Sequence, residues 1–374
     1  MNRPRLNLRT LDMLRGILAV YVLLGHCRWL LWAGHSAWMA APHAKWIEPL
    51  VFASAAFRYG REAVMVFFVL SGFFIHLRFA QSSNALQETT AGGFYRRRAH
   101  RLGAPYVFAL SATLALDLIG RSMWPVLYNG STGDALTDGI FARTGYGWQS
   151  VVPALVVLPS SLGFDFGTNG PLWSLAYEVV YYAIYPAWLM LRRSSALAAY
   201  AIVPVACGLL VLLPAANFFT IVLLFYPVWL TGAALAELLT TDRIRVPLAA
   251  AAIAGAAGFA LHVWGGLTML PSVPAMLYGG AAVAFCASMS AQTIRSWPVR
   301  LFEYLGVRSY SIYIVHFPFV ALMSAALFAH GGRPLHGWFA AAGGLFAVAF
   351  GCGCFELCER HFVHHRVPDA KLAG

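Results

Sequence analysis

The chain has 374 residues, of which 60% are hydrophobic and only 11% are charged, and its formal net charge is +11. Because soluble globular proteins carry about a quarter charged residues, this composition excludes an ordinary soluble protein and predicts a polytopic membrane protein. A basic excess suits either nucleic acid or anionic lipid. Here most arginines fall in alternate connections between apolar runs, which predicts contact with membrane lipid and no nucleic-acid partner.

Apolar runs of about 20 residues, the length at which a helix crosses a bilayer, recur through the whole chain. They predict an all-α transmembrane bundle of about ten spans. We find no internal repeat and no soluble domain, so a single domain is expected over residues 1–374. The predicted spans are 10–33, 62–80, 102–121, 172–191, 196–214, 218–239, 247–266, 274–291, 307–329 and 337–358.

The arginines also predict the orientation of the bundle. If both termini are cytoplasmic, the inner segments hold most of the basic residues, as the positive-inside rule requires. The long outer segments are then 34–61 and 122–171. The second has an apolar stretch that is too short to span and is broken by Pro153 and Pro159, which predicts a re-entrant or interfacial segment. We expect a multi-pass protein of a bacterial inner membrane.

The first span carries ionisable residues, each of which costs about 2.5–3.5 kcal/mol at the centre of a bilayer. Arg15 and His26 are eleven residues apart, which puts them about 20° from a common face and about 16 Å apart along the helix. Asp12 lies one turn before Arg15 and is expected to pair with it. Two alternatives stay open, because Arg15 could reach the cytoplasmic headgroups and His26 could be a buried structural histidine.

The second span begins near Glu62, which is expected to face the same cavity as His26. The alternative is that the helix dipole favours a carboxylate at the start of a helix. Further along this span, Ser71 and Gly72 predict close packing of a neighbouring helix.

Arg98 and Arg101 lie on one helix face at the cytoplasmic mouth of the third span, because they are three residues apart. Guanidinium groups suit bidentate capture of phosphate. The pair is therefore a candidate phosphate site, although ordinary positive-inside anchoring explains the same residues.

Glu178 lies about 10 Å inside the outer end of the fourth span, which follows the break at Gly170 and Pro171. His26 has a similar depth in its own span, so an imidazole and a carboxylate are expected to lie level. The aromatic and hydroxyl residues around Glu178 suit a sugar or, alternatively, form an interfacial belt. They are Trp173, Ser174, Tyr177, Tyr181 and Tyr182.

His316 lies about half-way along the span 307–329 and is either part of a polar passage or a core histidine. The neighbours expected to line that passage are Ser309, Tyr310, Ser311 and Tyr313. Near the C-terminus, His361, His364 and His365 follow no metal-ligand pattern, and the six cysteines all lie in apolar runs. We therefore expect no metal.

Five stretches, in order, resemble motifs of the acyltransferase 3 family of bacterial membrane O-acyltransferases. They are LDMLRGILAVYVLLGH at 11–26, FFVLSGF at 67–73, the pair Arg98 and Arg101, WSLAYE at 173–178 and SYSIYIVH at 309–316. The ERHF at 359–362 resembles a terminal ERPF-like motif, with His361 where proline is usual. We expect no extracytoplasmic hydrolase-like domain of the kind that many relatives carry.

The resemblance implies transfer of an acyl group, usually acetyl, from acyl-CoA to a hydroxyl of an envelope or exported polysaccharide or glycolipid. It also implies that Arg98 and Arg101 hold the CoA phosphates and that His26 is essential. The alternatives are a small secreted metabolite sugar as acceptor, succinyl as the acyl group, or, in another class, a transporter or flippase of glycan precursors. The oligomeric state is left open.

For the chemistry, we hypothesise that His26 is the general base and is oriented by Glu178 or another carboxylate. Arg15, Ser174 or a tyrosine would stabilise the oxyanion. A covalent acyl-histidine is a second route.

Overall fold

The computed structural model describes residues 6, 8–81, 90–214, 217–240, 246–264, 272–289 and 296–362. Within the described residues, all ten predicted spans fall on helices; residues 265–266 and 290–291, at the ends of two spans, lie outside the described residues. These helices are α1 (Leu8–Leu30), α4 (Gly60–Gln81), α6 (Ala91–Met123), α10 (Trp173–Ser194), the continuous run η4, α11 and η5 (Ala198–Leu212), α12 (Phe218–Leu224) with α13 (Tyr226–Thr240), α14 (Leu248–Trp264), α15 (Ser272–Ala287), α17 (Ser309–Ala329) and α18 (Trp338–Leu357).

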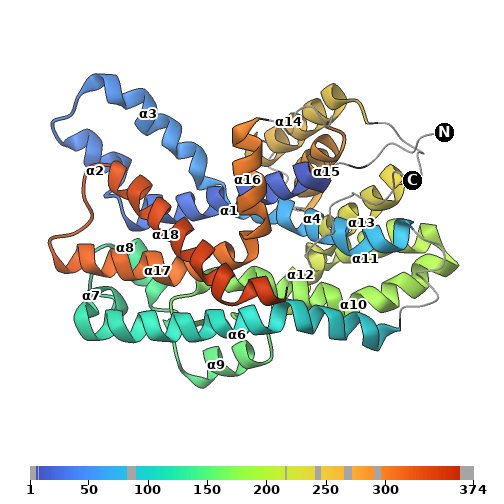
Figure 1. Ribbon diagram of the computed structural model, residues 1–374, viewed down its shortest axis with the longest axis horizontal. Helices are drawn as coiled ribbons and strands as arrows, with labels where there is room; N and C mark the ends of the chain where they lie inside the picture. Colours follow the sequence, from blue (N-terminus) through green and yellow to red (C-terminus); the bar gives the residue numbers. More distant parts are fainter. Residues whose placement is uncertain are drawn as a thin grey trace.

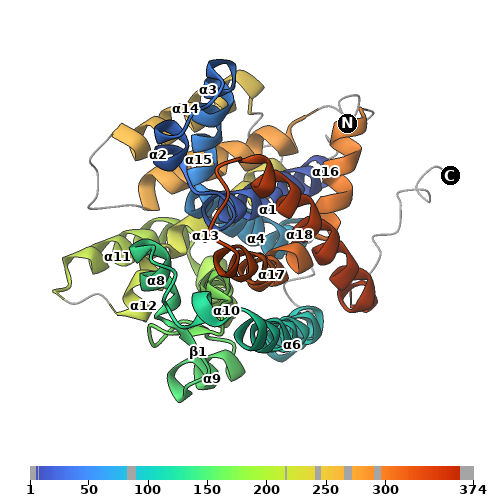
Figure 2. The ribbon, with the colours of Figure 1, turned by 90° about the vertical axis from the view of Figure 1, so that its left-hand side faces the viewer.

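The all-α class is therefore confirmed. Five of these helical segments are long and apolar enough to cross a membrane, namely α4, α6, α12 with α13, α17 and α18. The number of ten crossings and the cytoplasmic position of the termini stay predictions. The helices α6, α10 and α17 run along the long axis of the molecule (Figure 1). Seen end-on, α1 and α4 lie in the middle, with α14 and α15 on one side and α6 and α10 on the other (Figure 2).

The predicted outer segments are built from short elements. Segment 34–59 contains α2 (His35–Ala40), η1 (Lys45–Ile47), α3 (Glu48–Ala53) and η2 (Ser54–Arg58). Segment 124–172 contains α7 (Pro125–Tyr128), α8 (Ala135–Phe141), β1 (Thr144–Gly145), α9 (Trp148–Leu155), β2 (Asp165–Phe166) and η3 (Gly170–Leu172). The elements α2, α3, α7 and α8 gather at one end of the bundle (Figure 1).

The strands β1 and β2 were not expected from the sequence. They form a two-residue parallel pair, in which Thr144 lies opposite Asp165. The buried carboxylate of Asp117 in α6 fixes the segment that follows β2. It accepts hydrogen bonds from the backbone N–H and the hydroxyl of Thr168, at 2.8 and 2.7 Å. Polar partners of this kind let an irregular segment pack against apolar helices.

One further helix, α16 (Trp297–Val307), was also absent from the predicted spans. It packs across α1 at two glycines. A Cβ atom at Gly16 would overlap the backbone oxygen of Phe302, and one at Gly306 would overlap that of Asp12. This approach fixes the part of α1 that carries Arg15.

The close packing predicted at Gly72 is confirmed. A Cβ atom at Gly72 would overlap the backbone oxygen of Trp229 in α13, and one at Gly232 would overlap the backbone oxygen of Val69 in α4. The two backbones therefore touch, as small residues allow between membrane helices. This contact fixes the position of α4 beside the cavities described below.

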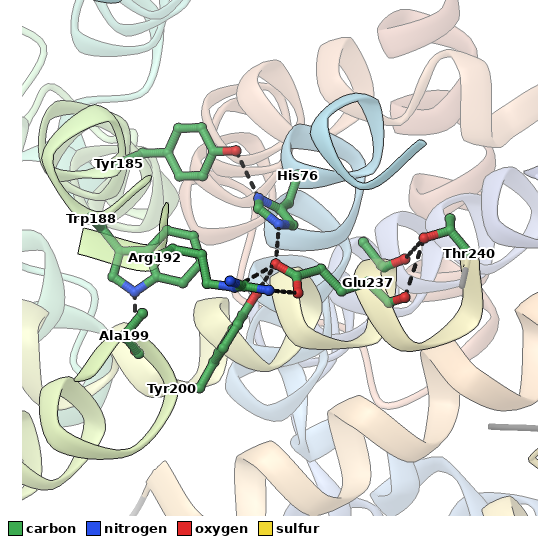
Figure 3. A network of polar contacts seen from close by, with 9 residues as sticks. His76, Tyr185, Trp188, Arg192, Ala199, Tyr200, Glu237 and Thr240 are labelled. Atoms are coloured by element: carbon green, nitrogen blue, oxygen red, sulfur yellow. Dashed lines mark hydrogen bonds and ion pairs between the residues drawn. The ribbon is translucent and has the colours of Figure 1, made fainter. Parts of the chain in front are cut away.

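A partly buried polar network ties α4, α10 and α13 together with η4 (Ala198–Ile202) (Figure 3). Glu237 lies at its centre and accepts from Arg192 Nε at 2.9 Å and from the Tyr200 hydroxyl at 2.8 Å. His76 lies between Glu237, at 2.8 Å, and the hydroxyl of Tyr185, at 2.9 Å. Because Glu237 of α13 contacts side chains from α4, α10 and η4, this network constrains the relative positions of the four elements.

We predict that Gly232→Ala destabilises the protein by about 1–3 kcal/mol, because the added methyl group forces α4 and α13 apart. Gly92→Ala is the matched control, since a Cβ atom on this helical glycine of α6 meets nothing within 4 Å. Thermal unfolding in detergent measures both variants. Equal stability of Gly232→Ala and the parent protein would contradict the close contact.

Candidate functional site

Two cavities lie among α1, α4, α6, α10 and α17. We call the first the arginine cavity, since Arg15, Arg98 and Arg101 line it; its volume is about 240 Å³. We call the second the histidine cavity, since His26 lines it; its volume is about 850 Å³. Most of the predicted site residues are divided between these two spaces.

The arginine cavity gathers the charged residues predicted from separate spans. Arg15 of α1 lies 3.4 Å from Asp12, as the spacing predicted. Arg98 and Arg101 reach the cavity from the first part of α6, which begins at Ala91 and so extends well before the predicted span. The buried Nε of Arg98 has no hydrogen-bond partner within the described ranges. It is therefore available to an anionic ligand.

Glu178 of α10 also lines the arginine cavity. Its Oε2 accepts a hydrogen bond from the Tyr182 hydroxyl at 3.0 Å, and Tyr182 contacts Ser71 at 3.2 Å. Ser309 and Tyr310 of α17 line the same space. The cavity thus combines three guanidinium groups with one carboxylate and several hydroxyls, which is a composition suited to phosphate.

The histidine cavity combines aromatic rings with further charges. Trp173 and Tyr177, which were predicted to bind substrate, line it beside His26, whereas Ser174 faces the arginine cavity. Its charged residues come mainly from the predicted outer side and are Arg28, Arg58, Arg61 and Asp165.

The two cavities adjoin between α4 and α17, because Val64 of α4 and Tyr313 of α17 line both. The hydroxyl of Tyr313 lies 2.8 Å from the hydroxyl of Ser174 and 3.2 Å from the carbonyl oxygen of Pro171. Ser174 of α10 and Tyr313 of α17 therefore place a pair of hydroxyls at the boundary between the cavities. A molecule that reached from one cavity to the other would pass these two groups.

His26 is paired with His316. The Nδ1 of His26 lies 2.9 Å from the Nε2 of His316, and the rings are stacked with centroids 5.1 Å apart. The Nδ1 of His316 lies 2.7 Å from the carbonyl oxygen of Tyr313. Because a carbonyl only accepts, the neutral ring of His316 carries its proton on Nδ1 and its Nε2 accepts from His26. The neutral ring of His26 is then protonated on Nδ1, which leaves a lone pair on Nε2.

The expected carboxylate partner of His26 is therefore corrected to a second histidine. Glu178 lies on the other side of the boundary formed by Tyr313 and Ser174. Residue counting gave similar depths for His26 and Glu178, but depth does not fix the direction in which α10 faces. His316 itself is fully buried and lines neither cavity. It therefore acts on the histidine cavity only through its hydrogen bond with His26.

Glu62 also requires a correction. It was expected to face the cavity of His26, but its carboxylate lies 2.8 Å from Nε2 of His262 in α14 and lines neither cavity. The reason is the rotation of α4 about its axis, which turns Glu62 away from the histidine cavity. Arg61, one residue earlier, lines the cavity instead.

Some site residues were missed by sequence reasoning. The sequence gives no role to Arg28, Arg58 and Arg61, because nothing in their spacing indicates that they line one cavity. Glu359 was noted within ERHF without a role. It is buried and accepts from both the backbone N–H and the hydroxyl of Ser311, at 3.0 and 2.6 Å, and so caps the first turn of α17. Ser311 therefore lies outside the predicted passage.

Comparison with known proteins identifies the type of domain. A family model described as an acyltransferase domain matches residues 8–355, which is nearly the whole chain. No curated protein and no solved structure matches the chain. The matched residues include all those that line the two cavities.

We predict that neutral His26 carries its proton on Nδ1 and that this preference disappears in His316→Ala. Magic-angle-spinning ¹⁵N spectra of histidine-labelled protein distinguish the two ring nitrogens, and loss of the signals in His26→Gln assigns them. A proton on Nε2 of His26 in the parent protein would contradict the direction of the hydrogen bond.

Proposed function

The chain belongs to the acyltransferase 3 family, and we propose that it moves an acyl group, normally acetyl, from acyl-CoA to a hydroxyl of a glycan or glycolipid. The observation that carries the proposal is the arrangement of the two cavities. Three arginines lie on one side of the Tyr313–Ser174 boundary and a histidine with an available lone pair lies on the other.

The donor is proposed to bind at the arginine cavity. CoA is a cytosolic polyanion, and Arg98 and Arg101 are its proposed phosphate ligands. In the proposed orientation, with ten spans and both termini cytoplasmic in a bacterial inner membrane, this cavity faces the cytosol. The volume of about 240 Å³ is too small for a whole CoA molecule, so only its arm would enter, with the thioester towards Tyr313.

The acceptor is proposed to bind at the histidine cavity. Trp173 and Tyr177 supply flat apolar faces for a sugar ring, and the volume of about 850 Å³ is ample for one or two sugar residues. The acceptor would arrive from the predicted outer side, where the elements of segments 34–59 and 124–172 surround the opening. A polysaccharide or glycolipid intermediate has the required hydroxyls.

The proposed reaction is a direct transfer. Nε2 of His26 takes the proton of the acceptor hydroxyl while the oxygen of that hydroxyl attacks the carbonyl carbon of the thioester. The carbon–sulfur bond then breaks, the proton passes from His26 to the thiolate, and the products are the ester and free CoA. The hydroxyls of Tyr313 and Ser174, with Arg15 behind them, are the proposed donors to the oxyanion.

We predict that His26→Ala lowers the rate of acetyl transfer about 10²–10⁴-fold, which is the usual contribution of a general base. Purified protein is supplied with acetyl-CoA and a glycan acceptor, and release of free CoA is followed. His330→Ala is the control, because the side chain of this exposed histidine bonds only to the carbonyl oxygen of Ala326 among the described residues. Unchanged turnover in His26→Ala would remove His26 from the chemistry, and a parent protein that neither binds nor consumes acetyl-CoA would favour a transporter.

We predict that the double variant Arg98→Gln/Arg101→Gln raises the KM for acetyl-CoA by at least about tenfold, since each charge-assisted hydrogen bond is worth about 1.5–3 kcal/mol. The KM for acetyl-pantetheine, which lacks the nucleotide phosphates, should not change. Arg96→Gln is the matched control, because Arg96 is exposed on the same helix and lines neither cavity. An equal effect on both donors would contradict phosphate binding at this pair.

A further inference from the structure

The histidine cavity contains three arginines that the reaction described above does not use. Arg28 donates from Nε to the hydroxyl of Ser54 at 3.2 Å. Arg58 donates to the hydroxyl of Tyr59 at 2.7 Å. The guanidinium of Arg61 lies 5.6 Å from the centre of the Phe225 ring. Their contacts are thus hydroxyls and rings, and none of the ion pairs among the described residues includes them.

Six arginines elsewhere in the described chain are in ion pairs with carboxylates, in contrast to these three. They are Arg9 with Glu303, Arg15 with Asp12, Arg192 with Glu237, Arg308 and Arg360 with Glu356, and Arg333 with Asp134. With only 15 acidic residues against 26 basic ones, carboxylates are scarce. The histidine cavity therefore holds a concentration of positive charge that the protein itself does not neutralise.

Among the described residues that line this cavity, the only carboxylate does little to offset the charge. Asp165 accepts a hydrogen bond from the Ser160 hydroxyl. Burial raises the pKa of Asp165, although Ser160 and Arg143 act in the opposite direction. One partly buried carboxylate thus faces three guanidinium groups.

Two helix starts add to the positive potential. Gly60 at the start of α4 and Gly170, just before α10, both line the histidine cavity. Each helix has 22 residues, and the first N–H groups of a helix have no partners within it and carry the positive end of its dipole. The arginines and the helix starts thus favour the same charge of ligand.

From this arrangement we propose that the acceptor is anionic: the sugar unit held beside His26 carries a carboxylate or a phosphate, which Arg58 and Arg61 bind at the mouth of the cavity and Arg28 binds deeper. This inference rests on the proposed function, because it names the class of the acceptor. A planar guanidinium suits both oxyanions through paired hydrogen bonds. Uronic acids and sugar phosphates share this chemistry, whereas a neutral glycan does not.

The test measures binding without acyl-CoA, so that it does not depend on turnover. Three probes are titrated calorimetrically into the purified full-length protein, namely methyl glucuronoside, glucose 1-phosphate and the neutral methyl glucoside. The variants are Arg58→Gln/Arg61→Gln and the control Lys45→Gln, which removes an exposed outer charge that does not line the cavity. The same proteins are also placed in nanodiscs with and without phosphatidylglycerol, and their thermal unfolding is recorded.

We expect at least one charged probe to bind the parent protein about tenfold more tightly than methyl glucoside. The double variant should lose this preference while its affinity for methyl glucoside stays the same, and Lys45→Gln should keep it. A preference for the carboxylate probe would identify a uronic acid, and one for the phosphate probe would identify a sugar phosphate.

Equal binding of charged and neutral probes would overturn the proposal, as would equal losses in the double variant and in Lys45→Gln. Arginine-dependent stabilisation by phosphatidylglycerol without binding of either charged sugar would also overturn it, because the arginines would then serve a lipid headgroup. Failure of the proposed function gives a different result, since acetyl-CoA would be neither bound nor consumed while the preference for charged sugars persisted.

Discussion

The hydrogen bond between His26 and His316 is the contact on which the site depends. It joins α1 to α17, and it ends at a backbone carbonyl that can only accept. The direction of both hydrogen bonds is thereby fixed, and the lone pair of His26 is left on Nε2. A carboxylate in place of His316 would orient the ring equally well, but it would bring a charge into an apolar bundle at a high desolvation cost. A second neutral ring avoids that cost.

The helices around this contact are held together by close contacts between their backbones and by the polar network centred on Glu237. Gly16 with Gly306 fixes α1 against α16, and Gly72 with Gly232 fixes α4 against α13. Such contacts tolerate almost no displacement, because the interacting atoms are backbone. Since Arg15 and His26 lie on the same rigid helix, about 16 Å apart along it, the separation of the two cavities is set by α1 itself.

The sequence was sufficient for the helices and for the arginine cavity. Length and hydropathy located every long helix that lines the site, and helical spacing placed Arg15 beside Asp12 and Arg98 beside Arg101. Contacts between helices were not accessible in this way. A single sequence does not fix how a helix is rotated about its axis. For this reason the sequence pairs His26 with Glu178 of α10, and it favours Glu62 of α4 over Arg61 as a residue of the cavity. The short strands β1 and β2 depend on Asp117, whose partner Thr168 is 51 residues away.

The distribution of charge explains how such a bundle could bring two charged substrates together. Each cavity is rich in arginine, but the boundary between them is formed by Val64, Tyr313 and Ser174, which carry no charge. The proposed ligands would be held by their anionic parts, at a distance from the reacting atoms, while a neutral thioester and a neutral hydroxyl met at the boundary. Binding free energy from remote groups then serves to position the reacting groups. A guanidinium at the boundary would instead attract phosphate to the place that the thioester must occupy. The uncharged boundary is therefore as much a requirement of the proposed transfer as the arginines on either side.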